Sequence, residues 1–287
     1  MEIRGIFAGS VIEPAIMGIL NITPDSFYDG GAFYNNPEKA AETALQMHQD
    51  GAAIIDIGGE STRPGSSPLS ADEEMSRVIP VIKAIRKRSD KPLISIDTYK
   101  PQTAAEAAAA GADMINDIYA GRFDGSMFRV AAETGAAYVM MHMLKTPSDM
   151  QNNPQYSANG AVNDIIQFLS ERRDAALSAG IKKENIILDP GIGFGKTYDD
   201  NIEIMKRLSE LVSLGHPVLA GVSRKSVIGA ILDGAPPDKR VFGTAAAVAA
   251  AVCAGVSIIR VHDVKEMSEV ARTAAVLRPQ NPGRGAA

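Results

Sequence analysis

The sequence predicts a (β/α)8 TIM barrel, in which eight parallel strands alternate with helices, preceded by a short N-terminal β-hairpin. Eight short apolar runs alternate with amphipathic stretches of helical length, which is typical of parallel strands covered by helices on both faces. Each apolar run stops at a polar or charged residue. The segments from strand to helix are longer and more polar than the returning ones, which places the adaptable loops on one rim of the barrel.

The elements follow one another in a regular order. A hairpin over 3–6 and 11–13 is expected first, where it could close the bottom of the barrel. The apolar runs predict strands at 15–20, 54–57, 93–96, 114–116, 137–141, 186–188, 218–221 and 258–261. The amphipathic stretches predict helices at 37–50, 71–88, 101–110, 126–134, 161–179, 199–214, 240–254 and 264–277. No change of composition interrupts them, so residues 1–287 are expected to form one domain with a flexible tail at 278–287.

Residues at the ends of the predicted helices support these boundaries. Ser70 and Asp263 each precede a glutamate by three residues, which is the pattern of a capping box. Pro37 and Pro101 stand at a first helical position, where proline is tolerated. Glycine follows five of the predicted helices, where a left-handed C-cap is needed, at Gly51, Gly111, Gly135, Gly180 and Gly255.

Composition argues against several classes of function. A net charge of −5 provides no basic stripe for nucleic acid. Neither alanine-rich segment reaches the roughly 18 apolar residues of a membrane span, and the first residues lack the pattern of a secretory signal. The single cysteine, Cys253, cannot form an internal disulfide and is expected to be a small core residue. We therefore expect a soluble protein of the reducing cytoplasm.

Acidic and amide side chains end several of the apolar runs. They are Asp97, Asn116, Asp117 and Asp189. Burying such a group without a partner costs roughly 2–7 kcal/mol, so these side chains need a ligand or one another. Acceptors that converge in a barrel mouth suit a flat heterocycle with an amidine-like donor edge, such as a guanine or pterin ring. Mutual hydrogen bonds that merely close the barrel are the alternative.

Two long loops carry further candidate residues. The loop that begins at Asn21 includes Asp25 and Asp29 and is long enough to close over a ligand. The segment 56–65 combines a Gly-Gly pair with Arg63, whose guanidinium suits a phosphate or carboxylate. Ordinary turns and a surface arginine are the alternative interpretation.

The glycine-rich segment 189–197 does not predict a nucleotide site. Pro190 stands where a P-loop requires glycine, and Lys196 stands where the dinucleotide motif requires its third glycine. We expect these glycines instead to let Phe194 lie against a ligand.

Positive charge gathers after the last two strands, in Ser223-Arg224-Lys225-Ser226 and in Arg260-Val261-His262. This part of a barrel is a common phosphate site. Arg260 and His262 are two residues apart and are expected to face the same side, so that one anion could contact both. His142 is expected to form hydrogen bonds at the barrel end. No histidine spacing predicts a tightly held transition metal, whereas Mg²⁺ brought in by a diphosphate is compatible with the sequence.

Seven motifs in a fixed order resemble the pterin-binding barrel family and, within it, the dihydropteroate synthases. They are "GGESTRPG", "SIDTYKP", "INDI", "MHM", "DPGIGFGK", "GVSRKS" and "RVHD", in a match that runs from Met17 to His262. The resemblance implies that 7,8-dihydropterin-6-ylmethyl diphosphate condenses with 4-aminobenzoate to dihydropteroate and pyrophosphate, by early, SN1-like loss of pyrophosphate. It also implies Mg²⁺, membership of an enzyme class that sulfonamides target and, by analogy, a homodimer; it does not settle whether this chain is sensitive to them.

The resemblance further implies a role for each matching residue. The pterin would contact Asp97, Asn116, Met140, Asp189, Phe194 and Lys225. The diphosphate would contact Asn21, Arg63, Arg260 and His262, with Asn21 also on Mg²⁺. The aminobenzoate would contact Thr62, Arg63, Pro64, Phe194, Lys225 and Ser226. The catalytic set would be Asp97, Asp189, Lys225, Asp29, Arg260 and His262.

Two departures and two alternatives accompany this interpretation. Tyr28 stands where the family has a small serine, and Leu144-Lys145 replace its polar pair after the "MHM" motif, which puts loop packing in question. A methyltetrahydrofolate:corrinoid methyltransferase would keep the acids but not the diphosphate cluster. A non-catalytic pterin-binding paralogue would be expected to lack Asn21, Asp29 and Arg63, which this chain keeps.

Overall fold

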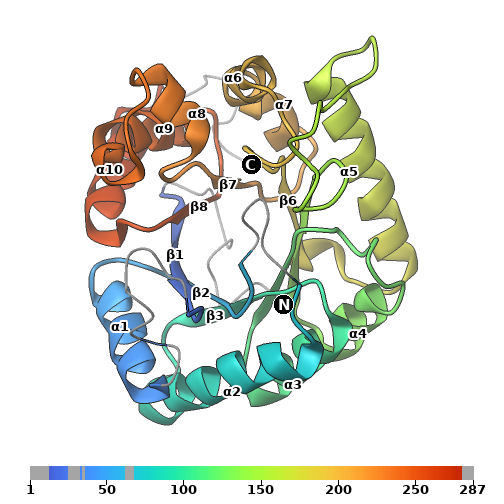
Figure 1. The fold of residues 1–287 in the computed structure, drawn as a ribbon, viewed down its shortest axis with the longest axis vertical. Helices are drawn as coiled ribbons and strands as arrows, with labels where there is room; N and C mark the ends of the chain where they lie inside the picture. The colour runs from blue at the N-terminus through green and yellow to red at the C-terminus, as the bar shows by residue number, and fades with distance from the viewer. Residues whose placement is uncertain (1–12, 25–32, 34–35, 62–67, 280–287) are drawn as a thin grey trace.

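Eight parallel strands form one sheet that closes into a barrel, and the helices form a ring around it (Figure 1). The computed structural model describes residues 13–24, 33, 36–61 and 68–279. Each strand pairs with its sequence neighbour, and β1 also pairs with β8, giving the order β6-β5-β4-β3-β2-β1-β8-β7. A parallel bridge between Leu188 and Val218 joins β6 to the residue before β7 and brings the two ends of the sheet together. The predicted (β/α)8 barrel is confirmed.

The strands begin where the sequence predicts, except β7, and most run one residue further. They are β1 Ala15–Asn21, β2 Ile54–Gly58, β3 Leu93–Asp97, β4 Met114–Asp117, β5 Ala137–Met141, β6 Ile186–Asp189, β7 Leu219–Gly221 and β8 Ile258–Val261. The polar residues that end the apolar runs therefore belong to the strands themselves. The predicted hairpin and residues 280–287 of the predicted tail lie outside the described residues.

The helices agree with prediction except around the sixth and seventh strands. They are α1 Pro37–Gln49, α2 Ala71–Arg88, α3 Pro101–Ala110, α4 Met127–Thr134, α5 Ala161–Ser178, α6 Tyr198–Lys206, α7 Leu208–Val212, α8 Ser226–Ile231, α9 Val241–Cys253 and α10 Val264–Leu277. The single helix predicted at 199–214 is interrupted at Arg207, whose φ of −112° is not helical. The short helix α8 was not predicted, nor were the 3-10 turns Lys183–Asn185 and Pro237–Lys239.

The predicted helix ends are mostly as expected. All five C-terminal glycines have positive φ, between +66° and +112°. The Ser70 hydroxyl accepts a hydrogen bond from the Glu73 amide at 3.1 Å. The predicted cap at Asp263 is wrong, because this carboxylate pairs with Arg224 instead. The prediction of a core position for Cys253 is also wrong, because α9 turns this thiol toward solvent.

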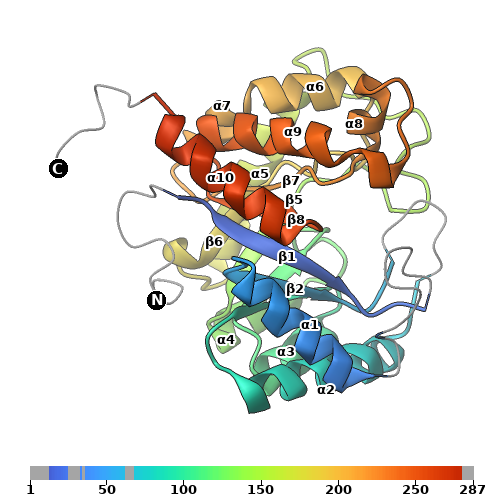
Figure 2. The ribbon, with the colours of Figure 1, turned by 90° about the vertical axis from the view of Figure 1, so that its left-hand side faces the viewer.

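Alternation along the strands separates two layers of core. One cluster fills the barrel and includes Met17, Leu93, Val139 and Ile258. The other lies between the strands and the helices. Figure 2 shows β1 running between α10 and α1, two of the helices of the outer ring. Since side chains alternate, every second residue toward the end of a strand points into the barrel mouth. Among the residues described, no helix is long and apolar enough to cross a membrane.

Candidate active site

A cavity opens at the carboxyl ends of the strands, on the rim that the loop asymmetry predicts. It is lined by Asp97, Asn116, Ile118, Met141, Asp189, Gly191, Ile192, Phe194, Gly221, Lys225 and Arg260. These residues come from β3 to β8 or from the segments that directly follow them. Acids and cations that lie far apart in sequence therefore share one mouth.

Arg260 lies between two carboxylates at this mouth. Its Nε donates to Asp56 Oδ2 at 2.6 Å, and its Nη2 donates to Asp97 Oδ2 at 2.8 Å. We call Asp56, Asp97 and Arg260 the mouth cluster. Asn116 Nδ2 also donates to Asp56 Oδ2, at 3.1 Å. The arginine is thereby fixed across the barrel from β8 to β2 and β3.

Asp56 is one of the polar strand ends that predict a site on this rim, but the sequence assigned it no binding or catalytic role. The side chain is fully buried, and its Oδ1 has no hydrogen-bond partner among the described residues. A buried acceptor left unsatisfied costs about 1–3 kcal/mol, so this oxygen favours a donor from water or a ligand. Its position as a polar strand end is the same signal that identified Asp97, and the contact with Arg260 is what gives it a role.

Burial shifts the pKa values of three residues that line the cavity toward neutral pH. Burial raises the pKa of Asp97 to about 7, with a further rise from Asp56 that Arg260 opposes. Burial also raises the pKa of Asp189 to about 6, although its carboxylate accepts the Gly191 amide at 2.6 Å. Burial and the nearby Arg260 lower the pKa of Lys225 to about 8. These groups can therefore change charge state when a ligand replaces water.

Lys225 and Phe194 meet at one side of the cavity. Lys225 Nζ lies 4.2 Å from the centroid of the Phe194 ring, within the range of a cation–π interaction. Gly193, with φ of +84°, permits this approach, because a Cβ there would lie 3.1 Å from Lys225 Cδ. The predicted purpose of the glycine-rich segment, to present Phe194, agrees with this geometry.

Two residues predicted for the ring site face away from it. Met140 is fully buried in the layer between strands and helices, whereas Met141 lines the cavity, so the assignment of Met140 is wrong by one residue. Asp117 also points outward, where it accepts the Tyr138 hydroxyl and the amides of Tyr119 and Gly121. Side chains alternate along a strand, so in each case the neighbouring residue, Met141 or Asn116, faces the cavity instead.

The expected concentration of free positive charge after the last two strands is largely neutralised. Arg224 forms a two-bond ion pair with Asp263. Burial, and then Arg260, lower the pKa of His262 to about 3, so its imidazole is neutral near pH 7. His262 Nδ1 lies 3.0 Å from Ser223 Oγ. Of these residues, Lys225 is therefore the cation whose charge can change near neutral pH.

Lys196, which the sequence only excluded from nucleotide motifs, is buried behind the cavity. Its Nζ donates to the carbonyl oxygens of Phe194 at 2.9 Å and His142 at 3.3 Å, and lies 3.1 Å from His142 Nδ1. Burial lowers the pKa of Lys196 to about 7 and that of His142 to about 2. The lysine joins the end of β5 to the segment that carries Phe194, and His142 forms hydrogen bonds at the barrel end as predicted.

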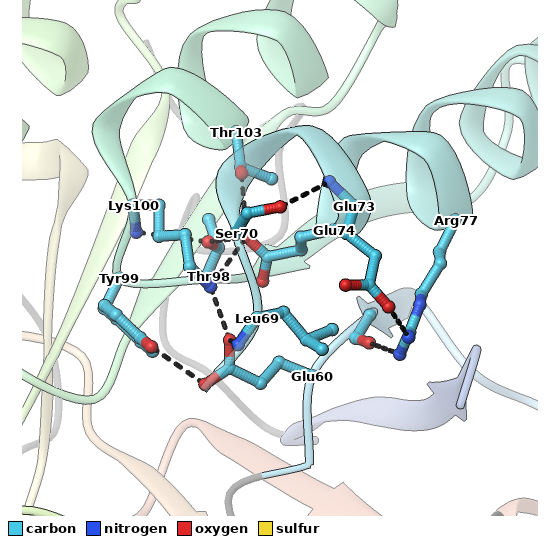
Figure 3. A network of polar contacts seen from close by, with 11 residues as sticks. Glu60, Leu69, Ser70, Glu73, Glu74, Arg77, Thr98, Tyr99, Lys100 and Thr103 are labelled. Atoms are coloured by element: carbon cyan, nitrogen blue, oxygen red, sulfur yellow. Dashed lines mark hydrogen bonds and ion pairs between the residues drawn. The ribbon is translucent and has the colours of Figure 1, made fainter. Parts of the chain in front are cut away.

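A second group of buried charges lies beside the mouth, between the segments that follow β2 and β3 (Figure 3). Lys100 Nζ contacts Glu60 Oε2 at 2.5 Å and Glu74 Oε2 at 3.3 Å. We call Glu60, Glu74 and Lys100 the anchor cluster. Glu60 also accepts the Tyr99 hydroxyl at 2.8 Å and the Leu69 amide at 3.1 Å. Glu60 therefore holds together the two ends of the segment that follows β2.

The remaining predicted residues fall into two groups, those outside the described residues and those at the ends of elements. Asp29, Thr62, Arg63 and Pro64, together with Asp25 and Tyr28, lie outside the described residues. Asn21 ends β1, and its Oδ1 would lie 3.4 Å from a Cβ on Gly58. Ser226 is the exposed first residue of α8. Within the described part of the chain, no group of three His, Cys, Asp or Glu side chains could hold a metal ion.

Comparison with known proteins shows the family to which this chain is similar. Residues 17–262 match the model of the pterin binding enzymes. The dihydropteroate synthase of Streptococcus pyogenes serotype M3 is 49% identical over 257 residues, covering 89% of this chain and 92% of the relative. A Yersinia pestis dihydropteroate synthase, solved with a sulfonamide drug complex, superposes with a TM-score of 0.87 at 44% identity, covering 93% of this chain and 94% of the other. A Xanthomonas albilineans dihydropteroate synthase in complex with 7,8-dihydropteroate has a TM-score of 0.82 at 38% identity, covering 94% and 95%.

Proposed function

The chain belongs to the pterin-binding enzymes and, among them, to the dihydropteroate synthases, and we propose that the cavity described above is where it joins its two substrates. The reaction condenses 7,8-dihydropterin-6-ylmethyl diphosphate with 4-aminobenzoate to 7,8-dihydropteroate and pyrophosphate, as a transferase of folate synthesis. One observation carries the assignment of this cavity. Acids suited to a donor-rich ring and cations suited to a leaving pyrophosphate open onto the same mouth.

The ring is held by acceptors at the ends of three strands. Asp97, Asn116 and Asp189 present carboxylate or amide oxygens toward the cavity and suit the amino and ring N–H donors of a pterin. Phe194 and Met141 supply apolar surface for its faces. Because apolar surface and acceptors line the same cavity, the flat ring is fixed both in its plane and in its orientation.

Bond breaking precedes bond making in the reaction that this geometry supports. The bond between the methylene carbon and the diphosphate oxygen breaks, and its electron pair leaves with pyrophosphate, next to Arg260 and Lys225. The carboxylates of Asp97 and Asp189 favour the positive charge that develops on the pterin and its methylene carbon. The lone pair of the neutral arylamine then forms the new C–N bond, and its surplus proton is lost. Asp29 is proposed to orient the amine, and His262, neutral at pH 7, to donate a hydrogen bond to the diphosphate.

We propose that Mg²⁺ enters with the diphosphate. The protein donor implied by the family resemblance is the single amide oxygen of Asn21, which is a poor binding site alone but fits an ion held mainly by phosphate oxygens and water. When bound, the ion would neutralise charge on the departing pyrophosphate. Arg63 is proposed to contact the same group.

We further propose a cytoplasmic homodimer that contacts itself through α9. This helix contains no charged residue, yet Phe242, Ala246, Ala250 and Cys253 are exposed on it, and Phe242 is 89% exposed. An uninterrupted exposed apolar stripe favours a partner surface. Sedimentation analysis should show a dimer that Phe242→Glu converts to a monomer, and a wild-type monomer at micromolar concentration would contradict it.

The proposed reaction is tested by measuring pyrophosphate release from purified protein with both substrates and Mg²⁺. Release should require the pterin diphosphate and 4-aminobenzoate together, and a sulfonamide should compete with the aminobenzoate. Omitting Mg²⁺ by chelation should lower the rate. If release does not depend on both substrates, or if the protein instead transfers a methyl group from methyltetrahydrofolate to a corrinoid, the assignment is wrong.

A further inference from the structure

The pairing of β7 with β8 continues beyond the last backbone pair, through side chains. Leu219 pairs with Ile258 and Gly221 pairs with Arg260, so partners along these strands are 39 residues apart. After the strands end, Ser223 Oγ lies 3.0 Å from His262 Nδ1 and accepts the His262 amide at 3.2 Å. One residue further, Arg224 Nε donates to Asp263 Oδ2 at 2.9 Å, and its Nη2 donates to Asp263 Oδ1. Both side-chain pairs keep the separation of 39.

Arg224 is fixed from every side in a backbone conformation that residues other than glycine rarely adopt. Its φ is +57°, in the left-handed region. Its amide donates to Thr244 Oγ1 at 3.1 Å, and its carbonyl oxygen accepts from Arg240 Nη1 at 2.8 Å. Non-glycine residues persist in this region where surrounding contacts hold them, and they cluster at functional sites. The unusual turn at Arg224 comes directly before Lys225, which lines the cavity.

We propose that Arg224 and Asp263 form a positioning clamp for the synthase reaction, holding Lys225 and His262 at a fixed separation across the ends of β7 and β8. The proposal rests on the function proposed above and adds two residues to it. The Arg224 guanidinium is committed to Asp263, so it acts on the substrate through Lys225 and not as a phosphate ligand. The side chains are 13% and 15% exposed, which limits exchange of the pair with water.

A direct phosphate contact from Arg224 is the competing account, and it makes the opposite prediction for Asp263. If Arg224 bound the diphosphate, neutralising Asp263 would release the Arg224 guanidinium and strengthen the protein's affinity for pyrophosphate. If the pair is a clamp, loss of either member removes the same two-bond contact, and loss of both costs no more than loss of one.

The chain provides a matched control at the opposite rim of the barrel. Arg86 Nη2 contacts Asp113 Oδ2 at 2.5 Å, with side chains 15% and 19% exposed, just before β4 begins. It is also an Arg–Asp pair of similar burial, although Arg86 donates in addition to the carbonyl oxygens of Gly111 and Pro92, and it lies at the amino ends of the strands. Asp113→Asn therefore measures what the loss of such a pair does to folding alone.

The experiment compares Arg224→Lys, Asp263→Asn, their double variant and Asp113→Asn with the wild type. We expect kcat/KM for the pterin diphosphate to fall tenfold or more in each clamp variant and no further in the double variant, while Asp113→Asn changes only the melting temperature. Pyrophosphate affinity, measured by calorimetry, should fall by similar factors in both single variants. Unchanged kcat/KM in the folded clamp variants, additive losses, or tighter pyrophosphate binding by Asp263→Asn would overturn the clamp.

The wild type separates this outcome from failure of the proposed function. If it releases no pyrophosphate from the two substrates, the synthase assignment fails, and the pyrophosphate affinities still decide whether Arg224 and Asp263 act as one unit. If Arg224→Lys does not fold, Asp263→Asn, which keeps the shape of the side chain, gives the same comparison.

Discussion

Two clusters in this barrel are built alike, each with one cation between two carboxylates, yet only one borders the cavity proposed as the active site. In the mouth cluster Arg260 bridges Asp56 and Asp97, and in the anchor cluster Lys100 bridges Glu60 and Glu74. The segment after β3 contributes to both, since Asp97 belongs to one and Lys100 to the other. The mouth cluster borders a cavity, whereas the anchor cluster is enclosed.

The surroundings of the two clusters explain their different roles. In the anchor cluster Thr98 and Thr103 donate to Glu74 Oε2 at 2.9 and 2.7 Å (Figure 3), while Glu74 Oε1 has no partner among the residues described. In the mouth cluster Asp97 and Arg260 line the open cavity, and Asp56 Oδ1 likewise has no partner among the residues described. What separates the two clusters is therefore the cavity, and buried charge indicates a binding site only where such a cavity lets a ligand reach it.

Arg260→Met should have the largest effect, and on catalysis. Loss of a preorganised cation next to the leaving group typically costs about 10²–10³-fold in rate, so we expect kcat/KM to fall by about 10³. Stability should change less, because Asp97, whose pKa is already raised to about 7, can take up a proton when its arginine is lost. Steady-state kinetics and thermal melting check both parts, and a variant that keeps more than a tenth of wild-type kcat/KM would contradict the role of Arg260.

The matching substitution in the anchor cluster, Lys100→Met, should act on folding. It leaves Glu60 and Glu74 buried without their cation, and breaking a buried pair in this way costs about 3–5 kcal/mol. Denaturant unfolding should show this loss, while the affinity of the folded protein for a free pterin stays within about twofold. If this variant keeps the free energy of unfolding of the wild type, the anchor cluster does not have the structural role that its burial indicates.

Two adjacent methionines repeat the comparison on one strand. Met140→Ala should destabilise by about 2–5 kcal/mol, because the side chain is fully buried between β5 and the helices, and should leave pterin affinity unchanged. Met141→Ala should weaken pterin binding by about tenfold, since it removes apolar surface from the cavity wall. Isothermal titration and denaturant unfolding separate the two effects, and the reverse pattern would restore the assignment made from sequence.

That wrong assignment shows where sequence patterns stop. Strands of a parallel barrel are buried on both faces, so the run Ala137–Met141 is apolar throughout and carries no alternation from which its facing could be inferred. The same ambiguity placed Asp117 in the site and left Asp56 without an assigned role. The barrel itself was predictable, because alternating strand and helix lengths and the glycine C-caps are local signals.

Pairing between distant residues was the other feature that the sequence could not show. Arg260 and Asp56 are 204 residues apart, and their contact exists only because β8, β1 and β2 are neighbours in the closed sheet. The sequence therefore overestimated the positive charge after the last two strands, because it does not show which acids pair with these cations. Similarly, Asp263 has the sequence of a helix cap, but its carboxylate pairs with Arg224, which follows the neighbouring strand β7 and lies 39 residues earlier in the chain.

The pH dependence of pterin binding gives the smallest expected effect and the finest test of the comparison. A free pterin that donates to ionised Asp97 and Asp189 competes with protons for them, so its affinity falls as the pH drops through about 7 and then about 6. Between pH 7.5 and 6.5 the loss should be about fourfold, because the ionised fraction of Asp97 falls about threefold and that of Asp189 only slightly. Burial also raises the pKa of Glu74, but this group lies in the anchor cluster and should leave binding unaffected. Titration calorimetry should therefore show the same pH dependence in Glu74→Gln as in wild type and a flatter one in Asp97→Asn; a dependence abolished by Glu74→Gln would mean that the enclosed cluster, and not the open one, governs binding.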